Sequence, residues 1–138
     1  MIILDTNVIS ELMKTSPNEH VIAWLDRQDA ITLFTTSITI AEITYGLDVL
    51  LVGKRRDYLE AAFNQVLIDA FKHRVLIFDE RAAHVYGKLM GHRKRSGHSL
   101  SVLDGQIAAI ARTHQMSLAT RNTRDFMDCE LNLINPFE

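Results

Sequence analysis

The sequence has almost no cysteine and little net charge. Cys129 is the only cysteine among 138 residues, so neither a disulfide within the chain nor a cluster of thiolate metal ligands can form. The formal net charge is −2, unlike that of strongly basic domains that bind nucleic acid. A metal ion would therefore need oxygen or imidazole ligands, and nucleic acid would need a local basic surface.

Long apolar runs are also missing. No run approaches the roughly 20 residues that a membrane-spanning helix requires. The apolar run at residues 1–4 reaches Asp5 too soon to form the core of a secretion signal. We therefore expect a cytoplasmic protein without a membrane segment. Hydrophobic residues make up 47% and charged residues 23% of the chain, which suits one globular domain over residues 1–138.

Short apolar runs typical of buried strands alternate with stretches of helical periodicity. Strands are predicted at residues 2–4, 31–36, 75–78, 117–120 and 131–134. Helices are predicted at residues 8–12, 19–26, 39–51, 55–71, 81–94 and 100–114, with a stop at Gly53. This alternation predicts an α/β fold with a mainly parallel sheet that is covered by helices on both faces.

Acidic and amide side chains fall at related places in this pattern. Asp5 follows the first predicted strand, and a segment with Asn122 and Asp125 follows the fourth. In open parallel sheets, ligands bind beyond the carboxyl ends of the strands. Glu42 and Asp104 lie in early turns of helices that would face the same edge. We therefore expect these side chains to meet at one rim of the sheet.

Carboxylates gathered in one cleft repel each other and are costly to desolvate, so they need a cation. Mg²⁺ and Mn²⁺ prefer oxygen ligands and commonly bridge to phosphate, whereas Zn²⁺ would require more His or Cys. Such an ion could polarise a phosphodiester and lower the pKa of an attacking water, and a second ion could stabilise the leaving oxygen. The pattern thus indicates hydrolysis without a protein nucleophile, by a one-ion or a two-ion mechanism.

Each acid also has a purely structural explanation. Asp5 could form a turn, and Asp125 could cap the segment that begins at Phe126. Glu42 could be an exposed helical residue, and Asp104 could complement a helix dipole. These explanations serve the residues one at a time, so the coincidence of all four favours a functional site.

Four short motifs resemble those of the PIN-domain ribonucleases and occur in that family's order. They are Ile3–Asn7, Ser37–Gly46 around Glu42, Asp104–Ala108 and Ala119–Phe126. Within this superfamily the chain most resembles VapC-type toxins of bacterial toxin–antitoxin modules, especially the FitB-like branch. The resemblance covers the whole chain, and its specificity comes from the order of the motifs.

The resemblance implies a three-layer α/β/α sandwich and a Mg²⁺- or Mn²⁺-dependent endoribonuclease, the toxin of a type II toxin–antitoxin system. It further implies inhibition by a small cognate antitoxin that also binds DNA. Asp5, Glu42 and Asp104 match the metal-site acids of the family and are predicted to be catalytic. The fourth metal ligand is either Asn122 or Asp125, because some relatives carry their acid at one place and some at the other, and Asp125 is predicted to be catalytic as well.

Residues beside these acids are candidates for contact with the RNA substrate. Thr6, Thr120, Arg121 and Arg124 are predicted to bind substrate, ranked below the acids, with hydrogen bonding to the backbone or ion pairing as alternatives. The basic runs 54–56 and 93–95 are more typical of solvated helix ends. The histidines, His73 and His98 among them, show no compact ligand pattern.

Apolar residues around Trp24, in 45–47 and in 49–52 could form a homodimer or antitoxin interface, or could belong to the core. An antitoxin arginine among the acids would inhibit by competing with the cation. Two rival functions remain. A haloacid-dehalogenase-like phosphohydrolase is disfavoured, because it needs an acid where Asn7 stands. A non-catalytic PIN-like regulator that binds RNA or a partner draws support from Asn122.

Overall fold

The computed structural model describes residues 1–72 and 74–138, and these residues form a five-stranded sheet in which all neighbouring strands are parallel. The strands, in spatial order, are β3 (Val75–Leu76), β2 (Leu33–Thr36), β1 (Ile2–Leu4), β4 (Ser117–Ala119) and β5 (Leu133–Ile134). From the central β1 the chain builds outward to β2 and β3, then returns to add β4 on the other side. The predicted parallel sheet is confirmed, and His73 lies outside the described residues.

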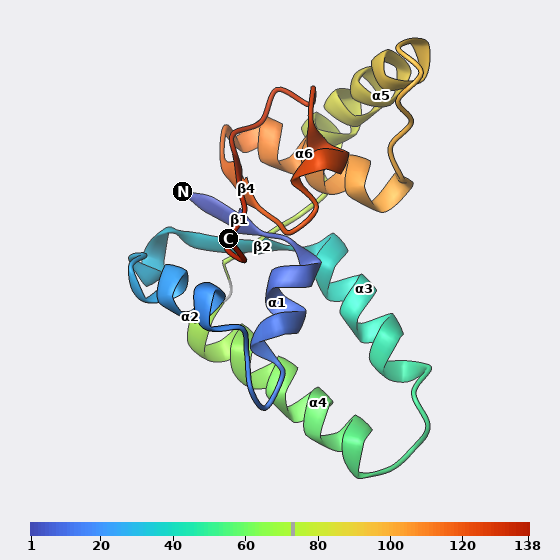
Figure 1. The fold of residues 1–138 in the computed structure, drawn as a ribbon. Helices are drawn as coiled ribbons and strands as arrows, with labels where there is room; N and C mark the ends of the chain where they lie inside the picture. Colours follow the sequence, from blue (N-terminus) through green and yellow to red (C-terminus); the bar gives the residue numbers. More distant parts are fainter. Residues whose placement is uncertain (73) are drawn as a thin grey trace.

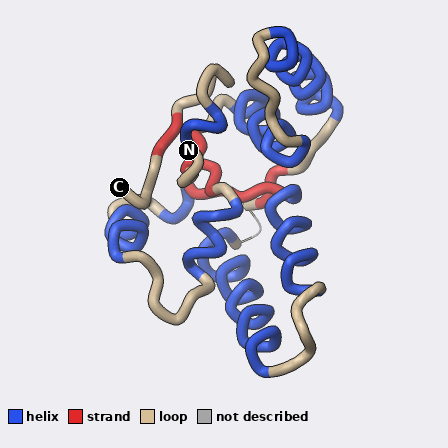
Figure 2. The backbone as a smooth tube through the Cα atoms, turned by 45° about the vertical axis from the view of Figure 1, so that its right-hand side comes forward, coloured by secondary structure: helices blue, strands red, loops and turns tan. Residues whose placement is uncertain are grey.

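Helices cover both faces of this sheet. They are α1 (Thr6–Leu12), α2 (Glu19–Asp26), α3 (Ser37–Asp48), α4 (Lys54–Val66), α5 (Glu80–Arg95) and α6 (Val102–His114), with the shorter turns η1 (Ala30–Thr32), η2 (Leu67–Phe71) and η3 (Thr123–Phe126). Figure 1 shows α5 and α6 on one side of the strands and α1, α2 and α4 on the other. The tube in Figure 2 shows the strands enclosed between these helical layers, so the predicted α/β/α arrangement is confirmed. In the described part of the chain, no helix is long and apolar enough to cross a membrane.

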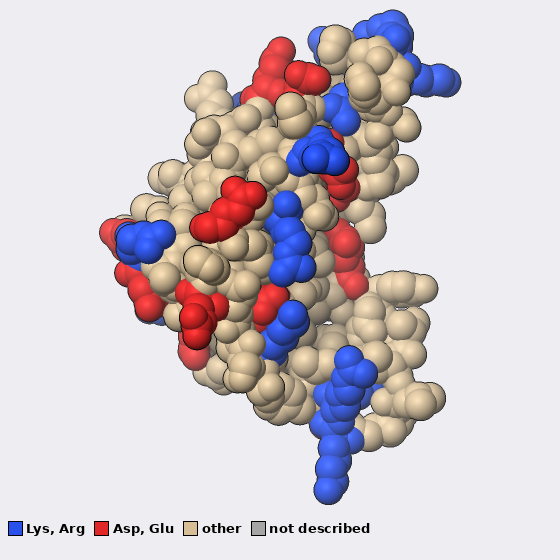
Figure 3. All heavy atoms as spheres, viewed as in Figure 1, with Lys and Arg blue, Asp and Glu red and all other residues tan. Residues whose placement is uncertain are grey.

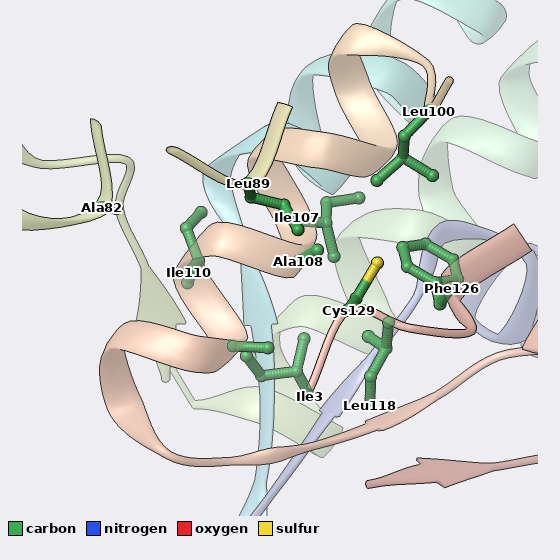
Figure 4. Close-up of a cluster of buried hydrophobic side chains, with 11 residues drawn as sticks. Ile3, Ala82, Leu89, Leu100, Ile107, Ala108, Ile110, Leu118, Phe126 and Cys129 are labelled. Atoms are coloured by element: carbon green, nitrogen blue, oxygen red, sulfur yellow. The ribbon is translucent and has the colours of Figure 1, made fainter. Parts of the chain in front are cut away.

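Neighbouring strand residues point to opposite faces and divide the core in two. Ile3 and Leu118 pack with α5 and α6 in one cluster, which also holds Cys129 (Figure 4). Leu4 and Ala119 pack into the other cluster, which α1, α2, α3 and α4 cover. These four strand residues are fully buried. This alternation fixes the orientation of β1 between the two clusters, and therefore the position of Asp5, which follows Leu4.

Several predicted boundaries differ from those in the structure, and three of them show where apolar patterning fails to locate the end of an element. The strand predicted at 31–36 begins at Leu33, because Asp29 accepts a hydrogen bond from the Ile31 amide and starts η1. The strand predicted at 75–78 is shorter because Asp79 caps α5. Gly53 was expected to stop α3, but that helix ends at Asp48, and Gly53 instead precedes α4 as its N-cap residue.

Gly105 allows α6 to lie close against α5, one residue after Asp104. A Cβ atom at Gly105 would lie 2.5 Å from Met90 Sδ and 3.0 Å from Tyr86 Cε1. We expect Gly105→Ala to destabilise the fold by about 1–3 kcal/mol, the usual cost of overpacking a helix contact. Urea denaturation followed by circular dichroism measures this change.

Gly87 provides the matched control within α5. A Cβ atom there would meet nothing within 4 Å, so Gly87→Ala should stabilise the protein by about 0.5–1 kcal/mol through helix propensity. If both substitutions were equally stabilising, the close packing at Gly105 would not constrain the position of α6.

Candidate active site

The candidate site lies where the chain reverses its direction of strand addition. The neighbours β1 and β4 end side by side, and the Asp5 amide donates to the Ala119 carbonyl at 2.9 Å. Such a switch point leaves a crevice beyond the carboxyl ends of the two strands. Asp5 and Thr120 are the first residues after these strands, so the topology delivers both to the crevice.

Asp5 is a buried carboxylate with its orientation fixed by hydrogen bonds. Its Oδ1 accepts from the Thr6 amide at 2.8 Å, which makes Asp5 the N-cap of α1. Its Oδ2 accepts from the Thr120 hydroxyl, also at 2.8 Å. Burial raises the pKa of Asp5, the nearby charge of Asp104 adds to the rise, and the bonds from Thr120 and Thr6 oppose it. The site therefore holds a carboxylate that gains from a nearby cation.

Glu42 reaches the same place from α3. Its Oε1 accepts from the Thr6 hydroxyl at 3.1 Å, and that hydroxyl also lies 3.1 Å from Thr39 Oγ1. Burial raises the pKa of Glu42, and the charges of Asp5 and Asp104 raise it further, against the effect of the Thr6 bond. Glu42 and Asp5 are thus linked through one residue, since Thr6 bonds to both.

Asp104 lies in the first turn of α6. Ser101 caps this helix, and its hydroxyl accepts from the Asp104 amide at 3.2 Å. Burial raises the pKa of Asp104, and the charge of Asp125 contributes to the increase despite the bond to Ser101. All three acids that the sequence predicted therefore share the same electrostatic condition, a carboxylate destabilised by burial and by neighbouring negative charge.

These acids line one open cavity of about 390 Å³. Its lining consists of Asp5, Thr6, Asn7, Ser10, Glu11, Lys14, Glu42, Asp104, Arg121 and Asn122. In the view of Figure 3, Lys and Arg side chains lie among Asp and Glu side chains. The cavity itself is lined by the cations Lys14 and Arg121 beside its acids, and cations of this kind can contact a phosphate backbone.

The two candidates for the fourth position lie in different places. Asn122 lines the cavity of the three acids, and its backbone N–H donates to Thr120 Oγ1 at 3.0 Å. Asp125 lines a neighbouring cavity that shares Asp104 as a wall and also contains Arg124. Of the two, Asn122 is therefore the one that lines a cavity with Asp5, whereas Asp125 faces Asp104 from the other side.

The hydroxyl groups predicted to contact substrate are engaged by protein groups in the structure. The Thr6 hydroxyl bonds to Glu42, and the Thr120 hydroxyl donates to Asp5 while accepting from Asn7 Nδ2 at 3.2 Å. Arg121 lies with its guanidinium carbon 3.9 Å from the centre of the Phe137 ring. Its position beside the acid cavity remains consistent with contact to substrate.

Sequence reasoning missed Glu11 and Lys14, which form part of the same cavity. Glu11 is buried, and it accepts from Lys14 Nζ at 3.0 Å and from the Asn18 amide at 3.0 Å. Burial disfavours the charged form of Glu11, but the Lys14 and Asn18 bonds and the charge of Arg121 lower its pKa overall. The available signal was the i, i+3 spacing of Glu11 in α1 and Lys14 just after that helix, which also describes an ordinary surface pair.

The donor set fits a hard divalent cation. Three carboxylates with raised pKa values and the side chains of two asparagines, Asn7 and Asn122, line the cavity, and Mg²⁺ or Mn²⁺ prefers oxygen ligands of this kind. Within residues 1–72 and 74–138, no group of three or more acidic, histidine or cysteine side chains stands ready to hold an ion. Mg²⁺ commonly binds one or two carboxylates directly and keeps several waters, so it does not require three acids in contact with it.

The raised pKa of Glu42 makes a prediction for the protein without metal. A carboxyl with a higher pKa in the folded chain stabilises the fold below its ordinary value of 4.5, and this contribution is lost as pH rises through the folded pKa. In EDTA, Glu42→Gln should therefore be more stable than wild type near pH 8, with the difference shrinking toward about pH 4. Urea denaturation across this range measures it, and a difference that is independent of pH would contradict the argument.

Comparison with known proteins places the chain among nucleases and toxins. The model of the PIN domain family matches residues 2–128. The chain is 44% identical to VapC ribonuclease Y4jK of Sinorhizobium fredii, with 100% of this chain and 99% of the relative covered. It is 39% identical to toxin FitB of Neisseria gonorrhoeae, with 99% of each covered. A solved structure of FitAB bound to an IR36 DNA fragment superimposes with a TM-score of 0.91 at 39% identity, covering 100% of this chain and 96% of that one.

Proposed function

This chain belongs to the PIN-domain family, and on that premise we propose that it is the endoribonuclease toxin of a type II toxin–antitoxin system. The observation that carries the proposal is the single cavity lined by Asp5, Glu42 and Asp104 at the switch point of the sheet. Similarity over the full chain to a VapC ribonuclease supports it. We take residues 1–138 as one nuclease domain that acts in the cytoplasm, where RNA is accessible.

The proposed cofactor is Mg²⁺ or Mn²⁺. Asp5 and Asp104 would hold the ion, with Glu42 and Asn122 contributing oxygens directly or through water. When bound, such an ion polarises the phosphodiester and lowers the pKa of the attacking water. A second ion would rely on Asn122 or Asp125, so the number of ions depends on which of these residues participates.

The protein's own contribution is to hold the acids in place. Asp5 is fixed on both oxygens, by Thr6 and by Thr120. The Thr6 hydroxyl holds Glu42, so the first turn of α1 orients two acids at once. We assign Thr6 and Thr120 to positioning these carboxylates, because their hydroxyls are already engaged by protein groups. Preorganised charge of this kind is a large part of catalytic power in metal-dependent hydrolases.

An antitoxin protein is the proposed partner, and exposed apolar residues of the protein support this. Tyr45, Val49, Leu51 and Val52 are exposed at the end of α3 and in the loop that follows, with Leu51 92% exposed. Leu47 instead belongs to the core. Apolar groups exposed together are typical of binding surfaces. This surface would serve an antitoxin or a second copy of the chain, and the antitoxin complex would bind DNA.

Cleavage of a mixed RNA pool with added Mg²⁺, Mn²⁺ or EDTA tests the proposal. We expect internal cuts with either metal ion and only background cleavage with EDTA, because the acids alone cannot activate water. Equal, low cleavage under all three conditions would reject the nuclease in favour of a non-catalytic PIN-like regulator. Sequencing the cut ends would then identify the RNA target.

A further inference from the structure

A second cavity adjoins the acid cavity and shares Asp104 with it. Its volume is about 400 Å³, and we name it the Arg93 cavity. Its charged and polar lining includes Arg93, His98, Ser101, Asp104, Arg124 and Asp125. From this wall the nuclease mechanism above uses Asp104, together with Asp125 if that residue holds a second ion. The remaining groups, particularly the arginines, therefore require a separate explanation.

Arg93 is a buried cation without an anionic partner. Its side chain projects from α5, and the residue is only 6% exposed. Its two terminal nitrogens donate to the carbonyls of Met127 and Asp125, the latter at 3.1 Å. Its Nε has no hydrogen-bond partner, and within residues 1–72 and 74–138 no carboxylate forms an ion pair with it. A buried charge with only neutral partners is costly, and an anion in the adjoining cavity would relieve that cost.

The rest of the wall favours an anion of the phosphodiester type. Arg124 and His98 are exposed at the cavity, and the first turn of α6 contributes its positive helix end behind Ser101. The carboxylates of Asp104 and Asp125 partly oppose these charges, so a singly charged phosphodiester suits the cavity better than a cluster of anions. Arginine binds phosphate oxygens with charge-assisted hydrogen bonds.

The two cavities share Asp104 as a wall, so one RNA strand could place a phosphodiester in each of them. A strand of RNA carries its phosphates at regular intervals, so a strand with one phosphodiester in the acid cavity presents a neighbouring one beyond Asp104. We propose that the Arg93 cavity binds the RNA phosphodiester next to the one that is cut, with Arg124 at the entrance and Arg93 at the base. This inference rests on the proposed nuclease function and names how that site holds its substrate.

Binding without cleavage provides the first test. Arg93 also donates hydrogen bonds to two backbone carbonyls, so replacing it would disturb the local fold. The exposed Arg124 is therefore the residue to change. Asp5→Asn protein in EDTA is titrated into a fluorescein-labelled single-stranded RNA oligonucleotide, followed by fluorescence anisotropy. Adding Arg124→Gln should weaken binding about tenfold and reduce the slope of log affinity against log salt by about one. Arg27→Gln, an exposed arginine outside this cavity, is the matched control and should change neither.

Cleavage kinetics provide the second test, in a background with intact acids. Arg124→Gln should raise KM for the oligonucleotide about tenfold with little change in kcat. Hydrolysis of a dinucleoside monophosphate, which has no neighbouring phosphodiester, should be the same for Arg124→Gln and wild type. The proposal would be overturned if Arg124→Gln slowed cleavage of both substrates equally, or if it slowed cleavage of neither.

The failures of the two proposals can be told apart. If wild type cuts no RNA with either metal, the nuclease function fails. If wild type cuts RNA but Arg124→Gln and Arg27→Gln bind and cut alike, only the Arg93 cavity proposal is overturned. Binding of a polyglutamate peptide that depends on Arg124, with no such dependence for RNA, would also overturn it and assign the cavity to an acidic protein segment.

Discussion

Replacing Asp5 with Asn is expected to lower RNA cleavage by roughly 100-fold to 1,000-fold, the usual cost of removing one preorganised electrostatic group from an active site. Asp5 is the most buried of the three acids and is held on both oxygens. Asparagine keeps the shape of this side chain but cannot supply its charge to a cation. The initial rate of cleavage of a fluorescent RNA at saturating Mg²⁺ measures the loss.

The fold should survive this substitution. The remaining oxygen of Asn can accept from the Thr6 amide and keep the N-cap of α1. Removing a buried charge with a raised pKa also removes a desolvation cost, so the thermal midpoint without metal should be equal to or higher than that of wild type. Asp26→Asn, an exposed acid at the end of α2, is the control and should retain full activity. Full activity in Asp5→Asn would remove Asp5 from the mechanism.

Thr120→Val should reduce cleavage about 10-fold to 100-fold, as is typical when a group that orients a metal ligand is lost. The Thr120 hydroxyl donates to Asp5 and accepts from the Asn7 side chain and the Asn122 amide. Valine has nearly the same shape but none of these bonds, so Asp5 loses its orientation and the Asn122 amide loses its acceptor. Unlike Asp5→Asn, this variant keeps all the acids.

The expected free energy of unfolding distinguishes Thr120→Val from Asp5→Asn, because only Thr120→Val should be destabilised. Thr120 is fully buried, and leaving its partners unsatisfied should cost about 1–3 kcal/mol of unfolding free energy. Thr44→Val, on the exposed side of α3, provides a control for the change of residue type. Activity that matches the control would show that Asp5 needs no support from the Thr120 hydroxyl, while loss of activity that higher Mg²⁺ restores would place the defect in metal affinity.

The sequence alone predicted the elements and the three central acids, because both depend on local patterns. Buried parallel strands require short runs such as Ile2–Leu4, and amphipathic helices require regular apolar spacing. Asp5 follows a strand, and Glu42 and Asp104 lie in the first turns of helices. The order of the motifs that contain these acids also matched a known family. The start of β2 at Leu33 was missed because the Asp29 cap, not hydrophobicity, sets it, and the end of α3 at Asp48 was missed because the apolar spacing continues to Leu51 beyond the helix.

Relations between distant residues were decided only by the tertiary structure. Sequence left Asn122 and Asp125 as equal candidates, and packing of η3 places Asn122 in the acid cavity and Asp125 in the Arg93 cavity. Arg93 belonged to a basic run that predicts a solvated helix end, yet the segment after β4 buries it. Burial and charge pairing arise from contacts between segments far apart in the chain, so no local pattern encodes them. The sequence determined which acids are present and where strands end, whereas the fold determined which of these groups share a cavity and which cation lacks an anion.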